Sequence, residues 1–297
     1  MKKLLLLMVL LLLCLPCALG EGATVTIEGK QYDAALESLD LSNVKIKDKT
    51  ALEVALSNMP NLKYVDMSFC GIGNEEMAQM REYWKNEGVK IVWTLKFGPF
   101  TCRTDATAFS TLNSSNSKRY GEDTFRVLQY ATELQALDLG HNWMFDISWI
   151  EPLTELRVLI LSDNRITDIS YLEGKPLEYF EMFNNRVNDI SCLKNCTTLI
   201  DLNLCATRVT DLSPLYELPN LQRVWMGNVK GLSKVSIDEF IALRGEDLEV
   251  YNFHTMYPTE YGWRVHERYE IIKAIFNEGR YMDFNTILRE DQYVSLW

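Results

Sequence analysis

The sequence of 297 residues contains only three histidines, His141, His254 and His266. None of them stands in a His-Glu-x-x-His arrangement or another metal-ligand spacing. The sequence also lacks a Gly-x-Ser-x-Gly nucleophile elbow and a glycine-rich phosphate loop. The best-marked classes of enzyme are therefore missing, and we expect no catalytic residue, no metal site and no cofactor.

Basic residues are outnumbered, with 30 Lys and Arg against 41 Asp and Glu, for a formal net charge of −11. An acidic chain disfavours nucleic acid and anionic lipid as partners. Paired carboxylates are common in such a chain, so their pairing alone indicates no acid–base chemistry. Asp105 beside Arg103 is the one pair that we considered as catalytic, and a turn or an ion pair is the more usual role.

The N-terminus, MKKLLLLMVLLLLCLPCALG, predicts a secretory signal peptide over residues 1–20. Two lysines precede an apolar run, and Ala18 and Gly20 are small residues spaced as at a cleavage site. The run is shorter than the ~20 residues that a permanent span needs. A lipid on Cys14 or Cys17 is an alternative, but neither follows the small residues that such a site usually has. We expect the mature chain to start at Glu21 and to be secreted or held at the cell surface.

Cleavage there would remove two lysines and no acidic residue, and would change the formal net charge from −11 to −13. Five cysteines would remain: Cys70, Cys102, Cys192, Cys196 and Cys205. An odd count at irregular spacing is not a disulfide framework, and no Cys-x-x-Cys pair occurs. We interpret these cysteines as small buried apolar residues.

The most informative part of the sequence is a run that repeats itself between residues 134 and 226. From one leucine to the next it reads LQALDLGHNWMFDISWIEPLTE, LRVLILSDNRITDISYLEGKP, LEYFEMFNNRVNDISCLKNCTT, LIDLNLCATRVTDLSPLYELPN and LQRVWM. The repeats start at Leu134, Leu156, Leu177, Leu199 and Leu221, in steps of 22, 21, 22 and 22 residues. Such a period marks a solenoid, in which each coil buries its apolar face against its neighbours.

Each repeat opens with the alternation of a strand and continues with a segment too short and too β-branched for a long helix. We therefore predict a parallel sheet on the concave side and short helices or 3-10 turns on the convex side. Asn142, Asn164 and Asn185 stand where successive strands end, and their amides can satisfy backbone groups of the turn. The alternative is that they are exposed loop residues.

A second column consists of Asp146, Asp168, Asp189 and Asp211. Each precedes an apolar residue and then Ser, which favours a capping role at the start of the turn. A ladder of calcium ligands is the alternative. We prefer the caps because of this apolar residue and Ser after each Asp.

These repeats resemble those of leucine-rich repeat proteins of the internalin type, which are secreted or surface-bound bacterial proteins. The coils from Leu36 and Leu62 are longer, with helical spacing at Leu52, Leu56 and Met59, and they resemble the ribonuclease-inhibitor type. The stretches CRTDATAFS, LDLGHN and GWRVHERY are similar to a group of secreted bacterial leucine-rich repeat proteins. The resemblance implies a scaffold that binds a protein on its concave face.

The predicted fold is thus an α/β solenoid, a leucine-rich repeat horseshoe with a C-terminal helical cap. Residues 98–133 break the register and form either a degenerate repeat or a hairpin insertion, and Tyr269, Ile272 and Phe276 lie on one face of the capping helix. In order, the regions are a signal peptide (1–20), an N-terminal cap (21–35), long-coil repeats (36–97), the irregular stretch (98–133), short repeats (134–230) and the C-terminal cap (231–297).

Outward positions on the concave strands are the third, fifth and seventh of each repeat, counted from Leu36, Leu62, Val89 and the later starts. Several of them carry large apolar groups, and exposed aromatic anchors usually mark interaction sites. The candidate partner-binding residues are Tyr179, Glu181, Phe183, Asp201, Asn203, Arg223, Trp225 and, with Ile91 and Leu95, Trp93. The alternative is that the irregular stretch or the C-terminal tail folds over them.

We therefore expect a secreted or surface scaffold that binds a protein or peptide on its concave face and catalyses no reaction. A module that binds glycan or cell wall is an alternative, since aromatic and acidic groups suit sugars. An enzyme with its site in residues 98–133 is a further alternative, which would need a nucleophile beside a histidine.

Overall fold

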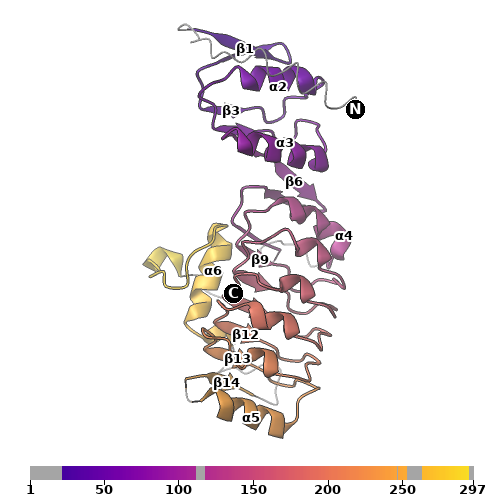
Figure 1. Ribbon diagram of the computed structural model, residues 1–297, viewed down its shortest axis with the longest axis vertical. Helices are drawn as coiled ribbons and strands as arrows, with labels where there is room; N and C mark the ends of the chain where they lie inside the picture. The colour runs from indigo at the N-terminus through magenta and orange to yellow at the C-terminus, as the bar shows by residue number, and fades with distance from the viewer. Residues whose placement is uncertain (1–21, 112–117, 246, 253–262, 294–297) are drawn as a thin grey trace. The chain divides into compact units, whose positions relative to one another are not determined.

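A computed structural model describes residues 22–111, 118–245, 247–252 and 263–293 (Figure 1). The predicted signal peptide lies outside the described residues. The chain divides into two compact units, residues 1–94 and residues 95–297, which are described one after the other.

The first unit begins with an antiparallel hairpin of β1 (Thr24–Ile27) and β2 (Lys30–Asp33). Two coils follow, in which β3 (Ser38–Asp40), β4 (Tyr64–Asp66) and β5 (Lys90–Val92) form a parallel sheet. Between the strands lie α2 (Lys49–Ser57) and α3 (Asn74–Asn86), each with one buried apolar face. The long front coils therefore carry the helices that their spacing predicts.

The register of the third strand differs from our prediction by one residue. Lys90 pairs with Tyr64, so Ile91 points into the core beside Val65 instead of outward. The error came from starting the coil at Val89, when the pairing starts it at residue 88. Because side chains alternate along a strand, a shift of one residue moves every side chain to the other face.

Trp93 and Leu95 are accordingly buried rather than exposed. The Trp93 indole N–H donates to the Asn74 side-chain oxygen over 3.0 Å, and the Arg81 guanidinium lies 5.1 Å from the ring centre. The expectation that Trp93 stands free on the concave surface is wrong, because its indole already has these partners in the first unit.

The second unit opens with a hairpin of β6 (Thr94–Phe97) and β7 (Phe100–Arg103). Aromatic rings from this hairpin and from the following coil pack together at centroid distances of 5.5–6.5 Å; they belong to Phe97, Phe100, Phe109, Tyr120 and Phe125. After the hairpin, β8 (Ala108–Ser110) pairs in parallel with β9 (Ala136–Asp138). The irregular stretch thus contains both a hairpin and one more coil of the repeat array.

Seven parallel strands, in the order β8 to β14, form the sheet of the second unit. After β9 come β10 (Val158–Ile160), β11 (Tyr179–Glu181), β12 (Asp201–Asn203), β13 (Arg223–Trp225) and β14 (Glu249–Tyr251). The pairing aligns Tyr179 with Asp201 and Arg223, and Glu181 with Asn203 and Trp225. The register predicted for residues 134–226 is confirmed.

Short helical turns form the opposite side of these coils. They are α4 (Glu122–Phe125), η1 (Arg126–Tyr130), η2 (Ser148–Ile150), η3 (Ser170–Leu172), η4 (Ser191–Asn195), η5 (Ser213–Leu215) and α5 (Lys234–Arg244). The first residue of η2, η3, η4 and η5 donates its backbone N–H to the Asp two positions earlier over 2.8 Å. The aspartate column therefore caps turns, as predicted.

The asparagine column binds one coil to the next. The Asn164 amide nitrogen donates to the carbonyls of Leu161 in its own coil and Leu139 in the preceding coil, both over 3.0 Å. Its oxygen accepts the Met144 backbone N–H over 3.0 Å, and Asn185 repeats the pattern one coil later. Both side chains are buried, so these bonds replace the water that the turn would otherwise need.

The C-terminal segment, residues 263–293, contains η6 (Trp263–Val265), α6 (Arg268–Glu278) and η7 (Glu290–Gln292). In Figure 1, α6 lies beside the sheet, on the side away from the helical turns. It contacts β8 and β9, and near its start Arg268 bonds to Gln222. The predicted amphipathic helix forms, and it covers the concave face of the sheet instead of the open end of the solenoid.

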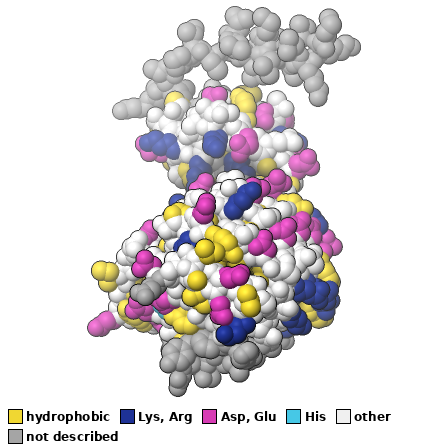
Figure 2. Space-filling model, turned by 60° about the horizontal axis from the view of Figure 1, so that its bottom comes forward, with side chains coloured by type: hydrophobic (Ala, Val, Ile, Leu, Met, Phe, Trp, Pro, Cys, Tyr) yellow, Lys and Arg dark blue, Asp and Glu magenta, His cyan; other side chains and the backbone are white. Residues whose placement is uncertain are grey.

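Charged side chains of both signs are spread over the face drawn in Figure 2, with hydrophobic side chains in small groups between them. Isolated apolar groups of this kind are normal on a folded surface. Of the described helices, none combines the length with the apolar character that a membrane crossing requires.

We predict that Asn164→Ala lowers the free energy of unfolding by ~1–3 kcal/mol, because it leaves the bonded carbonyls and the Met144 N–H buried without a partner. The matched control is Asn188→Ala, at an exposed position in the next coil, which should change stability by less than ~0.5 kcal/mol. Urea unfolding followed by circular dichroism measures both. Equal midpoints for the two variants would contradict the structural role of the column.

Candidate functional site

The concave face of the second unit brings together the predicted partner-binding residues, but it does not expose them. Tyr179, Phe183 and Trp225 are only 3%, 6% and 2% exposed. The expectation that these rings face solvent is wrong. The alternative, that the C-terminal tail folds over them, describes the structure.

The covering residues come from the C-terminal segment. The rings of Phe183 and Trp263 lie 5.3 Å apart, and those of Tyr179 and Phe284 lie 6.4 Å apart and stack. Trp225 stacks on Tyr251 of the neighbouring strand β14 at 5.3 Å and meets the His266 ring of the tail edge-on at 6.2 Å. The aromatic anchors that suggested an interaction site are indeed an interaction surface, and the chain's own tail occupies it.

The polar members of the predicted site are buried in the same interface. Glu181 accepts hydrogen bonds from the Tyr179 hydroxyl over 2.8 Å and from the Ser162 hydroxyl over 2.5 Å, and Arg264 approaches it to 3.8 Å. Asp201 and Arg223 form an ion pair at 2.6 Å, and Asn203 beside them is also buried. The charged groups are thus paired within the chain, and the Asn203 side-chain oxygen accepts the Cys205 backbone N–H over 2.9 Å, whereas its amide nitrogen has no hydrogen-bond partner among the described residues.

Burial shifts the ionisation of two concave carboxyls. Desolvation raises the pKa of Asp138 to about 6, against hydrogen bonds from the Gly140 N–H and the Ser110 hydroxyl that favour the charged form. Desolvation also raises the pKa of Asp201, and it outweighs the attraction of Arg223. A raised pKa can mark a catalytic acid, but here the C-terminal segment covers both carboxyls.

The candidate catalytic pair in residues 98–133, Arg103 and Asp105, has the more usual structural role. The Arg103 and Asp105 side chains form an ion pair at 3.0 Å. The thiol of Cys102 is buried, and desolvation raises its pKa to about 12, which leaves no reactive thiolate near neutral pH. Among the described residues, no group of three or more His, Cys, Asp and Glu side chains is arranged to hold a metal ion.

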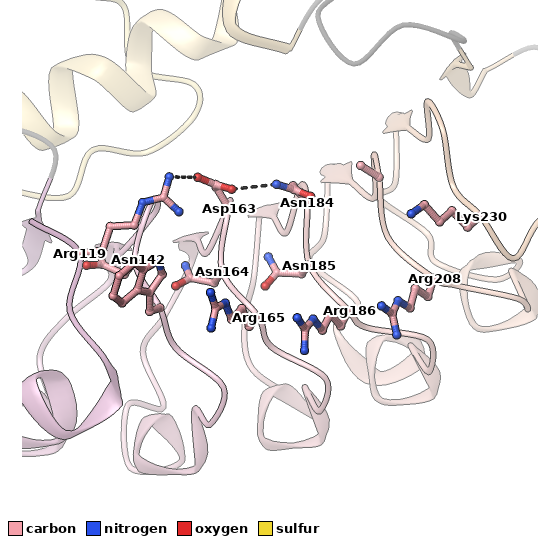
Figure 3. Close-up of a pocket in the computed structure, with 12 residues that line it drawn as sticks. Arg119, Asn142, Asp163, Asn164, Arg165, Asn184, Asn185, Arg186, Arg208 and Lys230 are labelled. Carbon is pink, nitrogen blue, oxygen red and sulfur yellow. Dashed lines mark hydrogen bonds and ion pairs between the residues drawn. The ribbon is translucent and has the colours of Figure 1, made fainter. Parts of the chain in front are cut away.

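An open polar cavity of about 270 Å³ lies along the edge of the sheet where the strands turn outward (Figure 3). Four exposed basic residues line it from four successive coils: Arg165, Arg186, Arg208 and Lys230. We call them the basic ladder. Within the described residues, no carboxylate comes within ion-pair distance of any of the four. Arg165 instead faces the rings of Trp143 and Phe145 at 5.6 and 5.5 Å.

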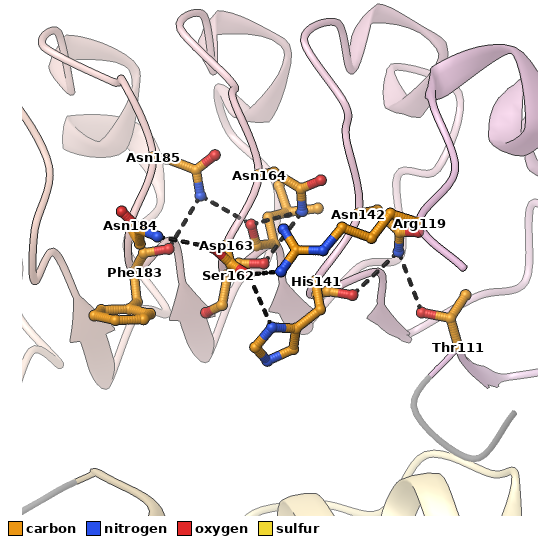
Figure 4. Close-up of polar contacts among 12 residues, drawn as sticks. Thr111, Arg119, His141, Asn142, Ser162, Asp163, Asn164, Phe183, Asn184 and Asn185 are labelled. Atoms are coloured by element: carbon orange, nitrogen blue, oxygen red, sulfur yellow. Dashed lines mark hydrogen bonds and ion pairs between the residues drawn. The ribbon is translucent and has the colours of Figure 1, made fainter. Parts of the chain in front are cut away.

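The upper wall of the cavity is a network centred on Asp163 (Figure 4). This carboxylate binds Arg119 at 2.7 Å, His141 at 3.1 Å and the Asn184 amide at 2.7 Å. Burial opposes its ionisation, but the His141 bond, the Arg119 charge and the Asn184 bond together hold the pKa of Asp163 below its usual value. Asp163 is therefore ionised near neutral pH and has its partners already.

The backbone at this wall adopts a left-handed turn in every coil. His141, Asp163 and Asn184 have φ angles of 58°, 53° and 52°. Each lies directly before an asparagine of the column. The residue directly after that asparagine is Trp143 in the first of these coils and a ladder arginine in the next two. The turn thus sends the residue before the asparagine to one wall of the cavity and the residue after it to another.

Our sequence reasoning missed the basic ladder, although the sequence shows it. Arg165, Arg186 and Arg208 follow Asn164, Asn185 and Thr207, and Lys230 stands one repeat later, in steps of 21, 22 and 22 residues. Lys and Arg are 30 of 297 residues, so four in one column are not expected from composition. The aromatic residues that suggested a binding site lie on the strands, whereas the basic ladder lies on the turns that follow them.

Comparison with protein families identifies the repeats. A model described as leucine-rich repeats in two copies matches residues 154–195, and a second leucine-rich repeat model matches residues 58–75. Together with the parallel sheet and the helical turns, these matches define the fold as a leucine-rich repeat solenoid. Proteins with this architecture generally act as binding scaffolds and not as enzymes. A search of curated proteins gives no significant match.

Solved structures with a similar fold include internalin C2 of Listeria monocytogenes, at 21% identity and a TM-score of 0.40, over 75% of this chain and 85% of that one. The functional domain of the Listeria internalin InlJ has 17% identity and a TM-score of 0.40, over 74% and 54%. The leucine-rich repeats of FLRT2, in an octameric complex with Latrophilin 3 and Unc5D, have 16% identity and a TM-score of 0.44, over 77% and 73%. Two of these three structures are internalins.

The shifted pKa of Asp138 predicts a pH dependence. A carboxyl whose pKa in the folded protein is raised to about 6 stabilises the fold at low pH, and this contribution is lost as the pH rises through 6. The loss is on the order of 3 kcal/mol at most. Asp138→Asn removes the titration while keeping the shape, so the variant should gain stability relative to the wild type between pH 4.5 and pH 7. Urea unfolding at both pH values measures this, and a constant difference would contradict the raised pKa.

Proposed function

We propose that the protein is a secreted or cell-surface scaffold that binds a protein or peptide partner without catalysing a reaction. One observation carries the proposal: four cations on successive coils line an open cavity without a carboxylate partner among the described residues. Exposed like charges on coils about 5 Å apart repel one another. An external ligand of opposite charge would remove that cost.

The concave face is a weaker choice for the partner, for an energetic reason. Five large side chains of the tail are buried against it: Trp263, Tyr269, Ile272, Ile275 and Phe284. At ~1.5–3 kcal/mol each, exposing them would cost on the order of 8–15 kcal/mol. A partner with a micromolar dissociation constant gains only about 8 kcal/mol in total. Partner contacts at Tyr179, Phe183 and Trp225 therefore stay a prediction that requires the tail to leave.

Secretion is part of the proposal and rests on the lysine, apolar and small-residue pattern of residues 1–20. We expect the chain to be recovered outside the cytoplasm with Glu21 as its first residue. N-terminal sequencing of the extracellular protein checks this. A start at Met1, or a lipid attached to Cys17, would rule it out.

Peptide binding can be tested without a known partner, by selecting a displayed library of random peptides on the immobilised chain, residues 21–297. We expect the wild type to enrich peptides that Arg186→Glu/Arg208→Glu binds at least tenfold more weakly. The double variant should unfold at the same urea concentration as the wild type, because both side chains are exposed.

The matched control is Lys96→Glu/Lys194→Glu, which makes the same change in net charge at two exposed positions away from the cavity. It should retain the selected peptides at full affinity. If no peptide is enriched, or if the two double variants bind the enriched peptides equally, the proposed function of this surface is wrong.

A further inference from the structure

We infer that the basic ladder binds an extended acidic segment of the partner, with a carboxylate on every second residue and an apolar residue beside Trp143. The inference rests on the proposed function and adds the chemistry of the ligand to it. It is carried by the regular spacing of the ladder, by the aromatic residues at one end and by the carboxylates around the cavity.

The backbone holds the ladder in line. The backbone N–H groups of Arg165, Arg186 and Arg208 donate to the carbonyls of Met144, Ile166 and Val187, one coil earlier, each over 2.9 Å. Figure 3 shows the three guanidinium groups on the same side of successive coils. Coils linked in this way lie about 4.8 Å apart, so Arg165 and Lys230 are separated by about 14 Å.

An extended peptide matches this length. Alternate side chains on an extended chain point the same way and lie about 6.8 Å apart, so three acidic residues at alternate positions span about 14 Å. Three carboxylates can then contact the four cations. The Lys and Arg side chains are long enough to compensate for the difference between the spacing of about 6.8 Å along the peptide and that of about 4.8 Å between coils. Arginine suits this role because its planar fork can bind a carboxylate with two parallel hydrogen bonds.

The end of the column at Trp143 differs from the rest. Trp143 stands at the ladder position of its coil and is 50% exposed, and Phe145 near it is 47% exposed. Their rings hold the Arg165 guanidinium from one side, which orients it before a ligand arrives. An apolar side chain next to the first carboxylate would bury part of these rings.

The surrounding charges favour spaced carboxylates over a dense polyanion. Asp163 lies in the cavity wall, and Asp168, Asp189 and Asp211 each follow a ladder arginine by three residues, as Asp146 follows Trp143. The chain as a whole carries a net charge of −11. Sulfated or phosphorylated polymers place charge on every unit and would be repelled by these carboxylates, whereas a peptide can place neutral residues opposite them.

The test is fluorescence anisotropy with the labelled peptide Leu-Ser-Glu-Ser-Glu-Ser-Glu-Ser-Leu, which has an apolar residue at either end and so fits in both chain directions. We expect it to bind the wild-type chain at low ionic strength at least tenfold more tightly than the same peptide with Gln for Glu. Binding should weaken with added salt. Arg186→Glu/Arg208→Glu should weaken it at least tenfold, and Lys96→Glu/Lys194→Glu should not.

Equal binding of the Glu and Gln peptides would overturn the inference, and so would an equal loss in the two double variants. Tighter binding of a sulfated oligosaccharide or a short polyphosphate than of the Glu peptide would overturn it in favour of a polyanion. Failure of the acidic peptide alone would leave the proposed function standing if the library still yields peptides that depend on Arg186 and Arg208. Failure of both experiments would remove the ladder as a binding surface.

Discussion

The hydrogen bonds of the buried asparagine amides set the geometry of the second unit. Each amide joins two coils and fills the place of the water that a sharp turn would need, as with Asn164 between Leu139 and Leu161. The bonds fix the distance between coils and the point at which each strand turns. Everything on either side of the turn then repeats in register, including the wall at Asp163 and the basic ladder.

The concave face shows how the same surface can serve the fold instead of a partner. Aromatic and acidic residues there meet a C-terminal segment that supplies rings and the Arg264 side chain. The acidic groups gain partners, and the pKa of Asp138 rises because water is excluded. Because the tail covers this face, we propose that the partner binds along the edge where the strands turn. The basic ladder on that edge is open to solvent, its residues are regularly spaced, and its charge is opposite to the net charge of the chain.

Repeat periodicity predicted the sheet from Leu134 onward, because eight positions per coil reinforce one register. It failed at the strand of Ile91, where a single coil of irregular length left two starting points one residue apart. The amphipathic spacing of Tyr269 and Ile272 predicted a helix but not its location, since an apolar helix face fits any apolar surface of similar width. The cover over Phe183 comes from Trp263, eighty residues further along the chain, and no local pattern encodes such a contact. The basic ladder was readable from the sequence and was missed because the turns were searched only for structural roles.

The central claim is that the C-terminal segment is part of the folded core and closes the concave face. Native-state hydrogen exchange of residues 21–297, followed by mass spectrometry, tests it most directly. The account predicts that the backbone amides of α6 exchange as slowly as those of β10, β11 and β12, through the same cooperative unfolding. Exchange of α6 at the rate of an unstructured segment, with the sheet still protected, would contradict it. The concave residues would then be open to a partner.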